Sequence, residues 1–435
     1  MYLTVKQEPK FNKQELDILK ELSHTAKNLY NEALYNIRQY FFNTGSYLSY
    51  YDNYKELKSS INYKSLNSNM AQQILKEVDG SFKSFFKLLN MKKNHEYEGK
   101  AKIPHYKDKD GYSTLVIGMV RITANNKLVI PMSNSFKKHH KRIEISIPPQ
   151  LVNKHIKEVR IIPKCNASYF EFQYTYEAQL IDNKELSSHK YISLDIGLNN
   201  LITAITSNGS SFIIDGRYIK SFNQWFNKEN ARLTSIHYKQ LKIKGNDSRI
   251  KIPYTKRQLL LLDKRNKRIN DYISKSARYI INYCIDNDIG NIILGYNPDI
   301  QKEANIGKAN NQSFVSIPIA KLKDKLTYLS KLYGINLILQ EESYTSKASF
   351  FDEDEIPTYS KNDDYSSSYS FSGTRIKRGL YKTSSGTLIN ADINGSLNIL
   401  KKALLNTSKA DDCKNILNNL CIVGHVDVPK RIRLA

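Results

Sequence analysis

The chain has few cysteines and no long hydrophobic run. The cysteines lie far apart and form no CxxC pair, at Cys165, Cys284, Cys413 and Cys421. This pattern argues against a disulfide-stabilised secreted fold and a cysteine-based zinc site, so no structural zinc is expected. No segment offers about 18 consecutive apolar residues, and the opening MYLTVKQEPKFNK lacks the apolar run of a signal peptide. We therefore expect a cytoplasmic protein with no membrane partner.

Acidic residues are also scarce relative to basic ones. The 66 Lys and Arg residues face 42 Asp and Glu residues, which gives a formal net charge of +24. Such an excess repels itself unless a polyanion neutralises it, so nucleic acid is the predicted partner. A generally basic soluble protein and a membrane-surface protein are the alternatives. With 435 residues, of which 40% are hydrophobic, the chain is long enough for two or three separate cores.

The first half combines helical and strand patterns. Apolar residues recur at helical spacing over residues 14–42 and 70–89, while the Tyr-, Asn- and Ser-rich segment between them is typical of a linker with short helix. Strand-like runs bounded by Gly, Pro or Asn follow at residues 112–120, 127–131, 141–148, 158–163 and 169–178. These runs predict a small antiparallel β-barrel or sheet.

The second half changes to an α/β pattern. From residue 189 the order is strand, strand, strand, long helix, strand, helix, strand, which predicts a layered α/β fold with parallel strands. The long helix has an apolar stripe at Ile269, Ile273, Ala277, Ile280 and Cys284. Before the stripe lies a basic section formed by Arg257, Lys264, Arg265, Lys267 and Arg268. A solvated face explains these charges; a helix that grips a nucleic-acid backbone also explains them, and the basic chain favours it.

Carboxylates stand at the ends of three separated elements. Asp195 ends the apolar strand YISLDIG, Glu341 and Glu342 follow the strand INLILQ, and Asp392 begins a helix in NADINGSLNIL. Such oxygen ligands suit Mg²⁺, and carboxylates from separate segments can converge on two metal ions that hydrolyse phosphodiesters. The alternatives are a turn residue for Asp195, a dipole-favoured helix start for Asp392, and solvated or lysine-paired glutamates.

Several segments together resemble the TnpB family, the transposon-encoded RNA-guided DNA nucleases of the OrfB type that are related to type V CRISPR effectors. They include KAKIPHYKDKDGYSTL, YISLDIGLNNLITAITSNG, NQSFVSIPIAKLKDKLTYLSKLYGINLILQEESYTSKASF and FSGTRIKRGLYKTSSGTLINADINGSLNILKKA, so the resemblance covers nearly the whole chain. It implies a multi-domain α+β and α/β protein, in which a helical recognition module is inserted in a wedge-like β-barrel and an RNase-H-like (RuvC) α/β nuclease domain follows.

The resemblance also implies domain limits and partners. The barrel would span residues 1–12 and 96–186, the helical module 13–95, and the nuclease domain 187–342 and 389–407. The partners would be a guide RNA made from the transposon end and a double-stranded target DNA with a short flanking motif. The cofactor would be Mg²⁺, as two ions, with Mn²⁺ as a substitute. Asp195 would be the first catalytic Asp and Asp392 the last.

The glutamate position departs from the family. Most relatives place the catalytic Glu at the end of the strand that reads NIILGYN in this sequence, where this chain has Gly295. The site is therefore either inactive or rearranged. Gly295 leaves room for a glutamate from the neighbouring strand, whose end opens on the same rim. We prefer Glu342 as that ligand, with Glu341 as the alternative.

A second departure lies at residues 343–388, where relatives usually carry the two CxxC pairs of a zinc ribbon. We predict a metal-free insert in which Arg375, Lys377 and Arg378 are available to phosphates. Alternatively, the acidic run Asp352 to Glu355 pairs with these bases. For the C-terminal tail, residues 408–435, two hypotheses remain: the tail is disordered, or it contacts RNA.

Two rival functions remain beside the nuclease. A nuclease-inactive RNA-guided repressor accords with Gly295, whereas a guide-independent DNA-binding transposition accessory protein would bind any duplex in a salt-dependent way.

Overall fold

A computed structural model describes residues 1–180, 185–242, 252–297, 318–358, 369–377, 379–406, 416, 418, 420 and 428–434. The chain divides into two compact units, Met1–Gln179 and Leu180–Ala435. Three residues considered above, Arg378, Cys413 and Cys421, lie outside the described residues, as does most of the 408–435 tail. No helix within the described ranges combines the length and apolarity needed to cross a membrane.

The first unit contains the two predicted long helices, α1 (Lys13–Thr44) and α4 (Ser68–Lys93), with the short α2 (Tyr50–Leu57) and α3 (Ile61–Ser65) between them. A capping box starts α1, because the Asn12 side chain accepts from the Glu15 backbone and the Glu15 side chain accepts from the Asn12 backbone. Both helical patterns read from the sequence are confirmed.

The strands of the first unit come from both sides of the helices in sequence. β1 (Tyr2–Gln7) pairs with β6 (Tyr169–Glu177) in a sheet of order β1-β6-β5-β2, with β5 at Ile156–Lys164 and β2 at Leu115–Ile117. β3 (Lys127–Val129) and β4 (Glu144–Ser146) pair separately, next to α5 (Asn134–Lys137) and the 3-10 turn Pro149–Leu151. The helices are therefore inserted between β1 and its partner strand. That this sheet belongs to a closed wedge-like barrel stays a prediction.

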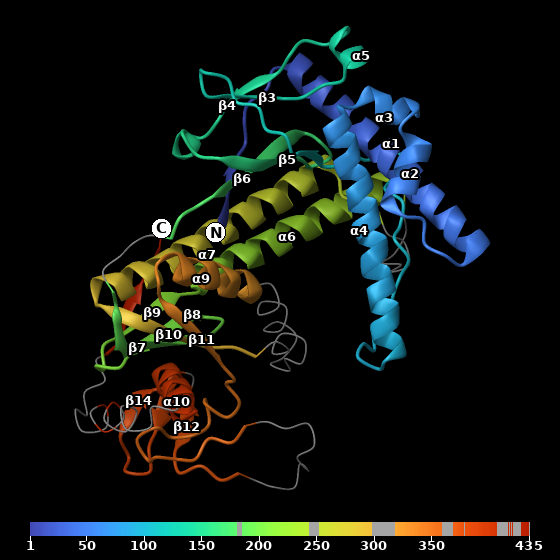
Figure 1. The fold of residues 1–435 in the computed structure, drawn as a ribbon. Helices are drawn as coiled ribbons and strands as arrows, with labels where there is room; N and C mark the ends of the chain where they lie inside the picture. Colours follow the sequence, from blue (N-terminus) through green and yellow to red (C-terminus); the bar gives the residue numbers. More distant parts are fainter. Residues whose placement is uncertain are drawn as a thin grey trace. The chain divides into compact units, whose positions relative to one another are not determined.

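The second unit is built on a six-stranded sheet of order β11-β10-β7-β8-β9-β15 (Figure 1). Its strands are β7 (Ser187–Ile196), β8 (Asn200–Thr206), β9 (Ser211–Asp215), β10 (Ile289–Gly295), β11 (Asn336–Gln340) and β15 (Lys430–Ile432). β8 runs antiparallel to both of its neighbours, and the other pairs are parallel. The expectation of parallel strands is thus corrected to a mixed sheet, because the short β7–β8 turn can join only antiparallel strands.

Helices cover both faces of this sheet. α6 (Arg217–Gln240), α7 (Lys256–Asp286) and α9 (Ile319–Leu332) lie above it in Figure 1, and α10 (Ala391–Leu405) lies below. The predicted single long helix is two helices, since Pro253 disfavours helix in the residue before it and Thr255 starts α7 with a second capping box. The predicted apolar stripe of α7 is buried, as expected.

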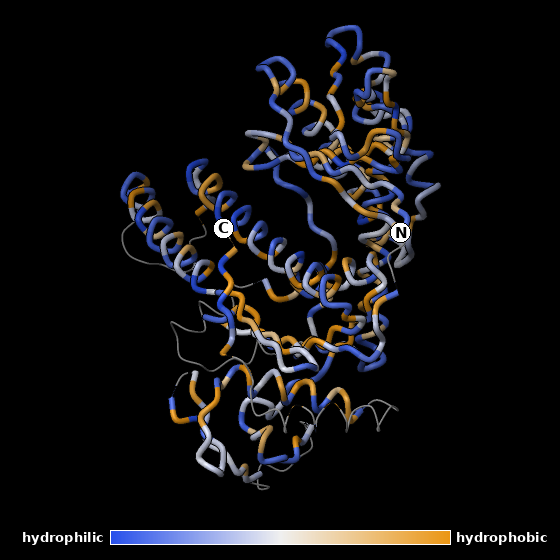
Figure 2. The backbone as a smooth tube through the Cα atoms, turned by 90° about the vertical axis from the view of Figure 1, so that its left-hand side faces the viewer, coloured by the Kyte–Doolittle hydropathy of each residue, from blue (hydrophilic) through white to orange (hydrophobic). Residues whose placement is uncertain are grey.

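Strand alternation assigns each side chain of β7 to one layer. Ile192 and Leu194 join the core formed with α7 and α9, whereas Tyr191 joins the core formed with α10. The two-residue period of a strand therefore places Asp195 on the α10 side. Figure 2 shows hydrophobic residues gathered along the strands, while the helices alternate between hydrophilic and hydrophobic positions.

Two later segments complete the unit. β12 (Thr374–Lys377), β13 (Leu380–Lys382) and β14 (Leu388–Asn390) form a small antiparallel sheet that leads into α10. Near the C-terminus, β15 pairs in parallel with β9. Residues 430–432 thus belong to the large sheet, which neither hypothesis for the tail foresaw.

Candidate functional site

The candidate carboxylates lie where the strands of the large sheet end, along the edge formed by the carboxyl ends of β7, β9, β10 and β11. Leu194 is in register with Leu294, and Gly295 is in register with Gln340, so β7, β10 and β11 end at the same edge. β8 begins at this edge with Asn200, which faces Asp215 at the end of β9. The terminal residues of strands that are distant in sequence thus lie side by side along this edge.

Asp195 lies against the backbone of α10. A Cβ atom added to Gly395 would stand 3.2 Å from Asp195 Oδ2, so a glycine permits this close approach. A reciprocal serine contact ties the helix to β7: Ser193 Oγ donates to the Ser396 carbonyl at 2.8 Å, and Ser396 Oγ donates to the Ser193 carbonyl at 3.0 Å. The first turns of α10 are therefore fixed beside the carboxylate.

The electrostatic environment of Asp195 is unfavourable for a charged carboxylate. Burial, together with the charges of Glu342 and Asp392, raises the pKa of Asp195 to about 8, against an opposing effect of Arg375. Burial and then the charge of Glu341 raise the pKa of Glu342 to about 7. Acidic groups are thus held together at this edge at a cost that a bound cation would relieve.

Glu342 occupies the space that Gly295 leaves open. A Cβ atom added to Gly295 would stand 2.9 Å from Glu342 Oε2 and 2.6 Å from Ile399 Cδ1. Any other residue at position 295 would therefore displace the carboxylate or the helix that covers it. The geometry agrees with the expectation that a glutamate from β11 reaches over β10.

Glu341 points to a different partner. Its carboxylate accepts hydrogen bonds from Lys402 Nζ and, at 2.6 Å, from the Ser343 backbone. Burial raises the pKa of Glu341, but the Lys402 and Ser343 contacts outweigh burial and lower it overall. The Lys402 side chain is only 5% exposed, so this glutamate neutralises a buried lysine. Of the two candidates, Glu342 is the one whose charge acts on Asp195.

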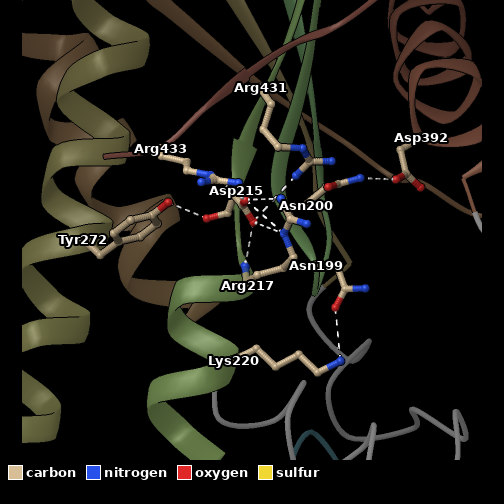
Figure 3. Close-up of polar contacts among 9 residues, drawn as sticks. All are labelled: Asn199, Asn200, Asp215, Arg217, Lys220, Tyr272, Asp392, Arg431 and Arg433. Atoms are coloured by element: carbon tan, nitrogen blue, oxygen red, sulfur yellow. Dashed lines mark hydrogen bonds and ion pairs between the residues drawn. The ribbon is translucent and has the colours of Figure 1, made fainter. Parts of the chain in front are cut away.

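Asp392 is held in the first turn of α10. The Asn390 side chain caps the helix by accepting from the Asp392 backbone at 2.9 Å. Asn200 Nδ2 donates to Asp392 Oδ2 at 2.6 Å, a contact drawn in Figure 3, and the Arg375 guanidinium lies 3.3 Å from Oδ1.

This contact corrects the expected pairing of Arg375 with the acidic run at Asp352 to Glu355. Asp352 and Asp354 instead accept hydrogen bonds from serines, namely Ser349, Ser372 and Ser384. Lys377 lies exposed on β12, with no ion pair among those found in the described residues.

The donor set suits a hard divalent cation, although its members are not gathered tightly enough to hold one. Within the described ranges, no group of three or more His, Cys, Asp and Glu side chains could hold a metal ion. Asp195, Glu342 and Asp392 nevertheless offer only oxygen atoms, which Mg²⁺ prefers. Two of the three carboxyls have raised pKa values, and the Arg375 guanidinium supplies positive charge where a cation would otherwise do so.

The basic section of α7 packs on the aromatic face of α6. Arg268 lies over the Phe222 ring at 4.9 Å, and Lys264 lies over Trp225 at 5.9 Å. Arg265 donates to the Asn223 side chain at 2.9 Å, and burial lowers its pKa, so it serves the contact between the helices. Exposed ion pairs engage the other two members, Arg257 with Glu229 and Lys267 with Asp263. Their predicted contact with nucleic acid stays a prediction.

Sequence reasoning missed a group of polar residues at the same edge. Asp215, at the end of β9, pairs with Arg217 and with two arginines from β15 and the residue after it, Arg431 and Arg433 (Figure 3). The strand end FIIDGR could have indicated Asp215 and Arg217. The basic segment around β15 is only a few residues long, too short for the sequence to predict a strand, so its arginines gave no signal.

Comparison with known proteins matches the segments that contain the candidate carboxylates. The family described as "OrfB_IS605: Probable transposase" matches residues 171–301, and the family described as "Cas12f1-like, TNB domain" matches residues 320–399. A TnpB-like protein, ORF457 of Acidianus two-tailed virus, is 25% identical over 413 residues, covering 89% of this chain and 83% of the relative. These matches support the TnpB family as the one that this chain resembles.

The candidate carboxylates fall inside the segments that the two family models match. Asp195 lies in the first, and Glu342 and Asp392 lie in the second. The CRISPR-associated endodeoxyribonuclease Cas12f2 of a Micrarchaeota archaeon is 26% identical over 256 residues, which are 56% of this chain and 42% of that protein. A cryo-EM structure of a Cas12f1–sgRNA–target DNA complex has a TM-score of 0.53 at 16% identity, covering 90% of this chain and 83% of that one. At that identity the likeness concerns the fold alone.

Proposed function

We propose that this protein is an RNA-guided DNA endonuclease that hydrolyses phosphodiester bonds at the sheet edge carrying Asp195, Glu342 and Asp392. The similarity of this chain to TnpB-like and Cas12f proteins supports a transposon-associated family of RNA-guided nucleases. The observation that carries the proposal is the meeting of acidic side chains from three separate segments at one edge, where burial and then their charges raise the pKa of Asp195.

The three carboxylates would draw closer together to hold Mg²⁺, as two ions, with Mn²⁺ as a substitute. Bound there, the ions would supply an activated water and stabilise the leaving oxygen of the phosphodiester. The chain itself supplies the positioning. Asn200 orients the Asp392 carboxylate, the close packing of Gly395 holds α10 against Asp195, and Gly295 leaves Glu342 its space. Arg375 keeps Asp392 partly neutralised until the site is filled.

Base pairing with the guide would read the target sequence, and the protein would bind the backbone of the duplex and a short flanking motif. The excess of basic residues supports this division of labour, since backbone contacts are electrostatic. Arg257, Lys264, Lys267 and Arg268 on α7 and Arg375 and Lys377 on β12 are the proposed contacts. Arg265 has the least support, because it lies in the contact between α6 and α7.

The test is cleavage of a plasmid library, with randomised bases beside the target, by protein co-expressed with its native RNA. We expect Mg²⁺-dependent cutting by the wild type and a loss of about 100-fold or more for Asp195→Asn, Glu342→Gln and Asp392→Asn. Glu341→Gln is the matched control and should keep measurable cutting if it folds, because its carboxylate serves Lys402. Equal inactivation of the two glutamate variants, with both proteins folded, would contradict the assignment.

A nuclease-inactive RNA-guided binding protein is the second candidate. Gly295 stands where relatives have a glutamate, and the carboxylates are not gathered into a metal-holding group within the described residues. This function predicts guide-dependent binding of the same targets without cutting in either Mg²⁺ or Mn²⁺. The wild-type arm of the cleavage experiment, read together with a gel shift, separates the two candidates.

A further inference from the structure

Three arginines surround one buried carboxylate at the edge of the large sheet. Asp215 is 4% exposed, and Arg217 donates to both of its carboxylate oxygens, at 3.0 Å and 2.6 Å. Arg431 and Arg433 approach the same group at 3.6 Å and 3.7 Å (Figure 3). The last two distances exceed hydrogen-bonding length, so these guanidinium groups are attracted by charge alone.

The cluster of Asp215, Arg217, Arg431 and Arg433 holds more positive charge than its folding role requires. Three guanidinium groups against one carboxylate leave two positive charges in excess. The side chains of Arg433 and Arg217 are 79% and 54% exposed, and that of Arg431 is 36% exposed. Each guanidinium carries five N–H donors, more than one shared carboxylate can accept. The remaining donors face solvent, where an anion can reach them.

The position of the cluster links it to the carboxylate site. Asp215 is in register with Asn200, and Asn200 donates to Asp392. Ile432 is in register with Ile214, so Arg433 follows β15 at the level of Asp215. Tyr272 on α7 donates to the Asp215 carbonyl and fixes the end of β9. Along the edge, Asp195 and Glu342 therefore lie on one side of Asn200, and Asp215 with its three arginines lies on the other.

We propose that Arg217, Arg431 and Arg433 bind a backbone phosphate of the DNA strand that is delivered to Asp195, Glu342 and Asp392. The inference rests on the proposed function, because the neighbouring carboxylates define which strand passes this edge. Guanidinium groups match phosphate oxygens through paired N–H donors, and Asp215 holds the three groups ready for that contact. Guide RNA has the same phosphates, but the strand at the carboxylate edge is the one that is cut.

The test compares an Arg431→Gln, Arg433→Gln double variant with Lys430→Gln. Lys430 is exposed beside Arg431 and has no ion pair with Asp215 among the described contacts, so its substitution removes one neighbouring charge outside the cluster, against the two lost in the double variant. Fluorescence anisotropy would measure binding of a labelled single-stranded DNA to the protein–RNA complex in EDTA, at several salt concentrations. We expect the double variant to bind about 10-fold more weakly, with a salt slope reduced by roughly 0.7 per lost phosphate contact.

Binding by the double variant that equals the Lys430→Gln control, with the same salt slope, would overturn the proposal. Should the double variant melt well below the wild type, Arg433→Gln alone serves, because its side chain is largely exposed. Guide RNA content is measured in each preparation. A loss of RNA together with unchanged DNA affinity at saturating RNA would assign the cluster to the guide and also overturn the proposal.

Cleavage kinetics separate this proposal from the proposed function. A positioning role predicts a KM raised about 10-fold with kcat largely retained, whereas Glu342→Gln should lower kcat. Wild-type cutting that the double variant matches in both parameters would refute the phosphate site and leave the nuclease standing. If the wild type never cuts but the double variant binds DNA more weakly than the wild type, the nuclease is refuted and the phosphate site is supported.

Discussion

Gly295 determines where the glutamate of this edge can stand. Because a side chain at this position would meet both Glu342 and Ile399, the glycine and the relocated carboxylate form one arrangement. The sequence predicted this space, since glycine has no side chain and stands at the end of the apolar strand NIILGYN. It could not choose firmly between Glu341 and Glu342, because the choice depends on Lys402, which reaches Glu341 from 61 residues away.

Gly295→Ala should therefore reduce both activity and stability. The added methyl would lie 2.6 Å from Ile399 Cδ1 and 2.9 Å from Glu342 Oε2, so the helix or the glutamate must move. We expect a loss of at least about 10-fold in cleavage and roughly 1–3 kcal/mol in the free energy of unfolding. Urea melts and plasmid cleavage measure the two effects. Gly45→Ala is a useful control for stability alone: nothing lies within 4 Å of its added methyl, so its cost comes from the left-handed backbone of this helix cap, which alanine disfavours.

Asp195→Asn should stabilise the metal-free protein. The pKa of Asp195 is raised to about 8, so the folded protein retains a proton that the unfolded chain releases above about pH 4. The wild type consequently loses stability as the pH rises from about 4 to about 8. Asparagine avoids this loss, and we expect a gain on the order of 2 kcal/mol at pH 8 that shrinks toward pH 4. Thermal melts in EDTA should show that the stability gain of Asp195→Asn over the wild type grows with pH. A gain that is the same at every pH would contradict its origin in the raised pKa of Asp195.

At the scale of elements, the sequence predicted those helices and strands whose pattern is contained in their own residues. The long periodic helices and the apolar strands β7 to β11 were predicted because each carries its own pattern. β15 was not, since it has only three residues, two of them basic, and only pairing with β9 makes them a strand. The division between α6 and α7 was missed because both segments are equally basic and helical in pattern.

Asp215 should stabilise the junction between β9, β15 and α6 in a pH-dependent way. Burial opposes its charge, but the hydrogen bonds from Arg217 outweigh burial and lower its pKa. A carboxyl with a lowered pKa stabilises the fold above its unfolded pKa of about 4, and the effect is lost as pH falls through the folded value. Asp215→Asn should lower the free energy of unfolding by roughly 1–3 kcal/mol at pH 7, with the difference closing below about pH 3.

Denaturant melts at the two pH values measure this effect. Glu229→Gln provides the comparison, because its partly exposed pair with Arg232 lies on the same helix and should matter little. An equal loss in both variants at pH 7, or a loss in Asp215→Asn that persists at pH 3, would count against the stated role of the arginines.

At the scale of the whole molecule, the chain contains two units with separate cores. The buried core of the first unit lies between Ile18 and Ala178, and Leu3 and Val5 of β1 pack against it. We therefore expect residues 1–179, produced alone, to melt in one cooperative transition and to show dispersed amide signals in NMR spectra. A fragment of residues 8–179 is the control and should melt at a lower temperature, because β1 supplies an edge strand with six paired positions. A 1–179 fragment with molten character would contradict this prediction.

The contacts of α10 with the start of the sheet set the order in which the nuclease edge can form during synthesis. The hydrogen bond from Asn200 to Asp392 cannot form until another 192 residues have been synthesised. The bond between Ser193 and Ser396 needs another 203. At about 5–20 residues per second, a ribosome needs on the order of 10–40 s to cross that interval. A nascent chain thus exposes Asp195 long before its partners exist, and the sheet gains β15 later still. Completion of the acidic edge is therefore among the last events of folding, so a truncated translation product would carry the strands of the site without its chemistry.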